Sequence, residues 1–84
     1  MAVEKAAAIR YRKGERAPLL LCKGKQHMSG KLIREAEKYG IPLVENPELL
    51  EELIVLEPLE YIPEEMFEAV AEILAFVYAQ GKRK

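Results

Sequence analysis

Four prolines lie within residues 40–84 and restrict where helices can begin and end there. Gly40, with Pro42 two residues beyond it, marks the end of a helix, because glycine accepts the left-handed cap conformation and proline cannot continue the helix. The residues Asn-Pro-Glu at 46–48 start a second helix, since they supply a side-chain cap, a proline whose missing N–H is not needed there and an acid at the positive end of the helix dipole. Pro58 ends that helix and Pro63 starts a third.

Between these signals, apolar residues recur at helical spacing and predict three helices. The expected buried faces are Met28, Leu32, Ile33, Ala36 and Tyr39 in the segment 27–39; Leu49, Leu50, Leu53 and Ile54 in the second segment; and Met66, Phe67, Val70, Ala71, Ile73, Leu74 and Val77 in the third. Apolar faces of this width are typical of helices that pack against a core.

The first 22 residues indicate a hairpin. Two apolar runs, 6–11 and 17–22, flank a polar loop that contains Gly14, and the second run has the unbroken apolar character of a strand covered on both faces. The Ala-rich first run could be helical from propensity alone, but the loop and the second run supply a pairing partner, which favours a strand. A short strand is also expected over 42–45, and the succession of strand, helix and strand indicates a right-handed crossover.

We therefore predict a small single α/β domain over residues 1–84, with a three- to four-stranded mixed sheet packed by about three helices and with flexible ends at 1–5 and 80–84. A chain of this length has room for one core, which buries about 60–65% of the surface that the unfolded chain exposes. Half of the residues are apolar and 32% are charged, a balance that argues against a disordered protein.

The sequence lacks the features of a membrane-inserted, a secreted or a metal-binding protein. No apolar run approaches the roughly 20 residues of a membrane span, and the N-terminus has no apolar stretch followed by a cleavage site. We expect a cytoplasmic protein without membrane insertion. Cys22 is the single cysteine and cannot form an internal disulfide, and a structural metal site needs several Cys or His ligands, so no metal or other cofactor is expected.

Charge is divided along the chain, with a net +6 in residues 1–40 and a net −7 in residues 41–84, within an overall net charge of −1. This asymmetry permits a basic face that could bind RNA or a nucleotide, and we keep that function as the alternative. A pI near 5.9 and the absence of tryptophan argue against nucleic acid as a partner, and 23–25 lacks the residue spacing of a phosphate-binding loop. The basic residues concerned are Arg10, Arg12, Lys13, Arg16, Lys23, Lys25 and Lys31.

Catalytic chemistry is not expected. His27 and Ser29 are the only histidine and serine, but a catalytic histidine needs a third group to orient it, and the nearest candidates are exposed lysines. Four glutamates lie in the last expected helix, but no histidine or aspartate is expected to lie beside them as a catalytic partner. We therefore expect a solvated acidic face there and predict no enzyme activity. These glutamates are Glu64, Glu65, Glu68 and Glu72.

Most of the chain resembles one known family, segment by segment and in order. The similar segments are Ala-Ala-Ala-Ile-Arg-Tyr at 6–11, Ala-Pro-Leu-Leu-Leu-Cys-Lys-Gly at 17–24, the residues 33–47 that end in Ile-Pro-Leu-Val-Glu-Asn-Pro, and 62–78. They resemble the cytoplasmic C-terminal domain of the FlhB/YscU/EscU family of flagellar and type III secretion export-switch proteins. The sequence departs from the family at 57–59, where the family usually has a slightly longer turn that contains glycine.

The resemblance implies a non-enzymatic accessory binding module of the flagellar or type III export apparatus, with export substrates and export-gate proteins as partners. In the family, substrates are received through a small apolar patch, and the residues of this chain that match the patch are Ala17, Pro18, Ala71 and Leu74. From the residues alone, a Pro-led strand beside small residues would leave a shallow groove, but Ala71 and Leu74 could also belong to the core. The sequence leaves the oligomeric state open.

The family cleaves itself within an Asn-Pro-Thr-His motif that lies just before the strand matched by 6–11. Met-Ala-Val-Glu occupies those positions here, so we expect a stand-alone form of the domain that does not cleave itself. Asn46-Pro47 is the only Asn-Pro pair, lacks the following Thr-His, and matches a helix start in the family. A helix cap is therefore expected at Asn46.

Overall fold

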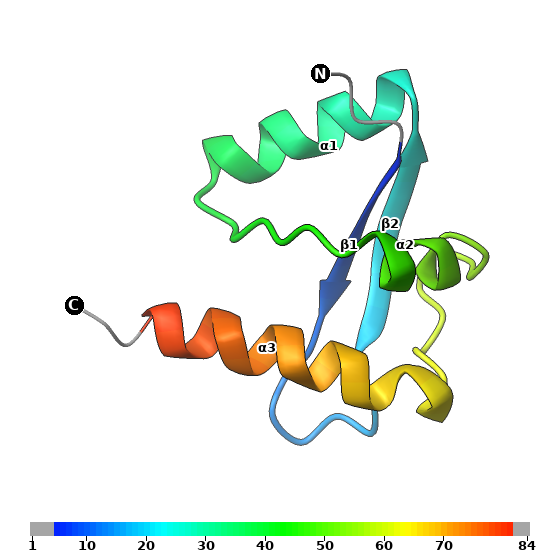
Figure 1. Ribbon diagram of the computed structural model, residues 1–84, viewed down its shortest axis with the longest axis vertical. Coiled ribbons are helices and arrows are strands. Elements are labelled where there is room, and N and C mark those ends of the chain that lie inside the picture. The colour runs from blue at the N-terminus through cyan, green and yellow to red at the C-terminus, as the bar shows by residue number, and fades with distance from the viewer. Residues whose placement is uncertain (1–4, 82–84) are drawn as a thin grey trace.

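The computed structural model describes residues 5–81, which form two strands and three helices. Figure 1 shows a hairpin of two strands with α1 and α3 at its opposite ends and α2 between them. The ends expected to be flexible fall mostly outside the described residues, although Lys5 already belongs to β1 and α3 continues to Gly81. In chain order the elements are β1 (Lys5–Arg10), β2 (Leu19–Lys25), α1 (His27–Lys38), α2 (Pro47–Leu53), the 3-10 turn η1 (Glu64–Met66) and α3 (Phe67–Gly81).

The predicted hairpin is confirmed. β1 and β2 pair in antiparallel register from Lys5 opposite Lys25 to Arg10 opposite Leu19, with a shift after Ala8. The Ala-rich segment is therefore a strand, because pairing with the apolar second run outweighs the helix propensity of alanine.

The second edge of β2 is partly covered by the segment that leads into η1. The Leu20 N–H donates to the Glu60 carbonyl at 3.0 Å, and the Ile62 N–H donates to the Pro18 carbonyl at 2.8 Å. The Leu59 N–H donates to the Leu20 carbonyl at 2.6 Å, and this leucine has a φ of 71°, a conformation that favours glycine. Both edges of β2 are thus hydrogen-bonded within the described residues. The expected covering on both faces is wrong, because Leu21 remains 38% exposed on one face while Leu20 is buried on the other.

The strand predicted over 42–45 does not form, and the right-handed crossover and the three- to four-stranded mixed sheet are wrong with it. Within the described part of the chain the sheet has two strands. Figure 1 shows the segment 41–46 running as an extended stretch between α1 and α3 toward α2. Pro42 lacks an N–H to give to a ladder, and Ile41, Leu43 and Val44 remain 57%, 52% and 42% exposed. Strand-type residues alone do not create a strand where no neighbouring edge pairs with them.

The predicted end of α1 and the predicted start of α2 are confirmed, whereas α2 ends at Leu53 and not at Pro58 as expected. Gly40 has a φ of 71° directly after α1, which is the left-handed conformation expected of a glycine at this position. At the start of α2, the Asn46 side chain accepts a hydrogen bond from the Leu49 N–H at 3.1 Å, and Pro47 occupies the first turn. The Asn-Pro pair is therefore a helix cap.

The core lies between the hairpin, α2, the segment after it and α3. Lys5 and Lys23 tie α2 to the hairpin, because Lys5 Nζ lies 2.6 Å from Glu51 Oε2 and Lys23 Nζ donates to the Ile54 carbonyl at 2.9 Å. No helix within residues 5–81 combines the length and apolar character that crossing a bilayer requires. The buried core cluster consists of Leu20, Leu49, Leu53, Leu56, Ile62 and Val70.

Candidate functional site

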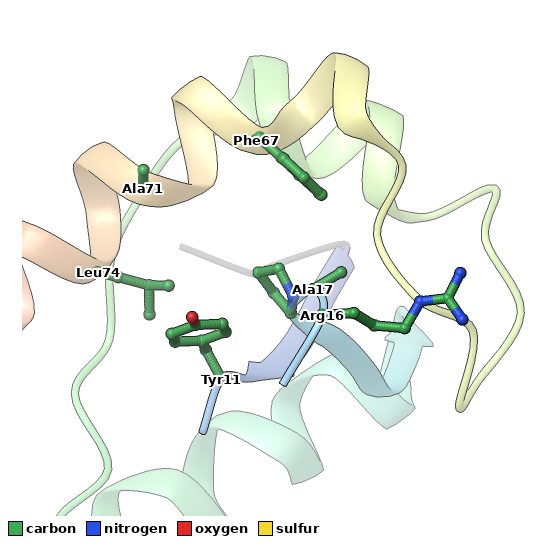
Figure 2. Close-up of a pocket in the computed structure, with 7 residues that line it drawn as sticks. Tyr11, Arg16, Ala17, Phe67, Ala71 and Leu74 are labelled. Carbon is green, nitrogen blue, oxygen red and sulfur yellow. The ribbon is translucent and has the colours of Figure 1, made fainter. Parts of the chain in front are cut away.

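The four residues of the predicted patch come together around one pocket. Ala17 and Pro18 stand at the entry to β2, and Ala71 and Leu74 come from α3, more than fifty positions later in the sequence. Figure 2 shows α3 passing over the start of β2, with the pocket between them. The fold therefore brings both halves of the patch to one place.

Three further residues complete the wall: Tyr11, Arg16 and Phe67. Figure 2 shows Tyr11 and Leu74 facing each other at one end, and Phe67 extending from α3 toward Ala17 at the other. The hollow has a volume of about 370 Å³, which is at the small end of the range of about 300–1,000 Å³ usual for ligand pockets. It has room for one or two large apolar side chains.

Burial separates the floor of the pocket from its rim. Ala17 is 6% exposed and Pro18 is buried, so these two residues form part of the floor. Ala71 is exposed and is therefore not a core residue, although the helical periodicity placed it on the buried face. Leu74 is half-buried and packs against the core cluster while it lines the pocket.

The loop that carries one wall of the pocket is held in shape by Glu15. Its carboxylate accepts from Arg10 Nη2 at 2.8 Å and from the Arg12 N–H at 3.0 Å, and its own N–H donates to the Arg12 carbonyl at 3.0 Å. Arg16 follows directly, with its guanidinium carbon 5.0 Å from the centre of the Tyr61 ring. Figure 2 shows that this guanidinium group points away from the pocket, so mainly the carbon chain of Arg16 contributes to the wall.

Sequence reasoning missed Tyr11, Arg16 and Phe67 as site residues. A signal existed for Phe67, because it precedes Ala71 by four residues and Leu74 by seven, which places all three on one helix face. No comparable signal exists for Tyr11 and Arg16, since their positions depend on the path of the loop that Glu15 holds.

The other candidates from the sequence do not meet at the pocket. Ser29 is fully buried and its hydroxyl donates to the Gln26 carbonyl at 2.5 Å, while His27 is exposed at the start of α1. Lys23, the first residue of the 23–25 segment, donates to the end of α2. Within residues 5–81 no three His, Cys, Asp or Glu side chains are grouped so that they could hold a metal ion.

Comparison with known proteins gives consistent results. Residues 3–77 match the profile of the FlhB HrpN YscU SpaS Family. The uncharacterized protein YlqH of Bacillus subtilis (strain 168) is 38% identical over 77 residues, which cover 90% of this chain and 83% of that protein. The flagellar biosynthetic protein FlhB of Aquifex aeolicus (strain VF5) is 36% identical over 80 residues, which cover 93% of this chain but 23% of that protein.

Solved structures of C-terminal domains show the same similarity. The crystal structure of the PscU C-terminal domain has a TM-score of 0.83 and 32% sequence identity, over 88% of this chain and 96% of that chain. A mutated EscU C-terminal domain has a TM-score of 0.82 and the same identity, over 87% of this chain and 90% of that chain.

Proposed function

Because this chain belongs to the FlhB HrpN YscU SpaS family, we propose that it serves flagellar or type III protein export as a non-enzymatic accessory binding module. The proposed contact is the pocket between the start of β2 and α3, and the proposed partners are export substrates or proteins of the export gate. We expect this contact to be made in the cytoplasm, where the resemblance places the domain.

The observation that carries the proposal is the pocket. Two residues from the hairpin and two from α3 match the substrate-receiving patch of the family, and they line one open apolar hollow. Binding sites are typically concave and mostly apolar, and this hollow has both properties. The exposed Ala71 leaves space above the floor for a partner's side chain.

Two further observations support binding rather than chemistry or nucleic-acid recognition. The pocket walls hold one basic group, Arg16, and no histidine, cysteine or carboxylate that could act on a bound molecule. Of the seven basic residues in the alternative function, Arg10 is paired with Glu15, Arg16 lies over Tyr61, and Lys23 binds the α2 terminus. A basic face therefore has fewer free cations than the sequence suggests.

The test is a charge placed in the pocket. Ala71→Asp introduces a carboxylate on an exposed position of the rim, so the domain should stay folded by circular dichroism. Affinity for a purified early flagellar export substrate should fall at least about tenfold, equivalent to about 1.4 kcal/mol, because an apolar partner side chain would meet an unpaired charge. Isothermal titration calorimetry measures the affinity directly.

The matched control is Ala79→Asp, which makes the same change at an exposed position of α3 that does not line the pocket. It should leave substrate affinity within about twofold of the unchanged protein. If both variants fold and both bind substrate normally, the pocket is not the contact and the proposed function is wrong at this site.

A further inference from the structure

A row of glutamates borders the pocket along α3. Phe67 and Ala71 line the pocket, whereas Val70 is fully buried and points to the core. Successive residues of a helix are about 100° apart, so Glu68 and Glu72 fall next to the lining residues on the side away from Val70. Both glutamates are exposed. The solvent side of the pocket is therefore edged with carboxylates.

No basic side chain among residues 5–81 forms an ion pair with these glutamates. Residues 63–81 contain no lysine or arginine, so η1 and α3 carry negative side chains alone. The two ion pairs among residues 5–81 join Lys5 to Glu51 and Arg10 to Glu15, and neither involves α3. The acidic residues of η1 and α3, all exposed, are Glu64, Glu65, Glu68 and Glu72.

The opposite side of the pocket carries the other sign of charge. The loop between β1 and β2 holds the exposed residues Arg12 and Lys13, and Arg16, whose carbon chain lines the pocket while its guanidinium group points away from it. The pocket thus lies between a cationic loop and an anionic helix. A bound segment with positive charge beside its apolar anchor would be repelled on the loop side and attracted on the α3 side, which fixes its orientation.

We propose that the pocket selects a polypeptide segment in which basic residues flank an apolar anchor, and that these basic residues lie along Glu68 and Glu72 of α3. This rests on the proposed function, because it assumes that the pocket receives a polypeptide segment, and it adds the chemistry and orientation of that segment. Exposed ion pairs contribute modestly, so two of them should change affinity by about threefold to tenfold.

Three synthetic peptides test the proposal. They share a Phe-Leu pair in a Gly-Ser background and differ at two positions on one flank, which are both lysine, both glutamine or both glutamate. Each is titrated into isotope-labelled protein at low salt, and the amide shifts of α3 and of the 11–18 segment report binding. The lysine peptide should bind about threefold to tenfold more tightly than the glutamine peptide, and the glutamate peptide more weakly than either. Raising the salt concentration should reduce the preference.

A charge reversal assigns the preference to α3. Glu72→Lys should abolish the preference for the lysine peptide, whereas Glu37→Lys, the same change at an exposed position of α1, should preserve it. Glu72→Gln should give an intermediate preference. A spin label on the lysine flank should broaden amides of α3 more than those of Arg12 and Lys13, because the orientation is set by both walls.

The outcomes separate this inference from the proposed function. Equal binding of the three peptides, or a lysine preference that survives Glu72→Lys, would overturn the inference while leaving the pocket as the contact. Tighter binding of the glutamate peptide would show that the cationic loop reads the ligand, and would overturn it as well. If no peptide shifts the pocket amides and Ala71→Asp leaves substrate binding unchanged, the proposed function fails too.

Discussion

Leu20 and Leu21 are neighbours in one strand with opposite surroundings, and replacing each by alanine tests the strand register. Leu20 is 0% exposed at the centre of the core, whereas Leu21 is 38% exposed. Leu20→Ala removes about three carbon atoms, a loss of about 2.4 kcal/mol in transfer free energy, and the cavity left behind adds about 1–2 kcal/mol. We therefore expect a cost of about 3–4.5 kcal/mol in the free energy of unfolding.

That cost is a large share of the stability of an 84-residue domain, which is about 4–12 kcal/mol. Leu21→Ala should cost less than about 1.5 kcal/mol, because part of its side chain already contacts water and no closed cavity forms. Urea unfolding followed by circular dichroism gives both values, provided the slope with denaturant stays constant. Equal losses for the two variants would refute the argument. A larger loss for Leu21→Ala would indicate a register displaced by one residue, because such a shift exchanges the two faces of the strand.

Three other expectations can be checked with the same purified protein. The chain should remain intact during days of incubation at neutral pH, and a mass-spectrometric break after Asn46 would contradict this. The double variant Lys25→Glu with Lys31→Glu changes two exposed side chains and should alter export-substrate affinity less than about twofold. If the basic face is the functional surface, the protein should instead bind RNA with a strong salt dependence, and this variant should lose that affinity. Leu59→Gly should raise the free energy of unfolding by about 0.5–1 kcal/mol, because a 69% exposed leucine at φ 71° gains little from its side chain; a lower thermal midpoint would count against strain there.

The sequence correctly predicted those features of the fold that depend on a few neighbouring residues. The glycine after α1 ends that helix through its own backbone conformation. The Asn-Pro pair starts α2 through one side-chain hydrogen bond to a nearby N–H. The strand expected over 42–45 failed because a strand needs a partner edge, and the spacing of apolar residues carries no information about that edge. Leu59 illustrates the same limit, since its left-handed conformation follows from its contact with β2 across the fold.

The residues of the candidate site could be named from the sequence, but the exposure of one of them could not. The resemblance supplied Ala17, Pro18, Ala71 and Leu74, but helical periodicity assigned Ala71 to the core, where a charged substitution would unfold the protein. The spacing of apolar residues cannot distinguish a residue that faces the core from one at the edge of the same apolar face, because both occur at the same helical spacing. The exposure of Ala71 decides the matter and changes what Ala71→Asp measures. For a core position the variant would report stability, whereas for this rim position it reports binding, so the pocket can be probed without loss of the fold.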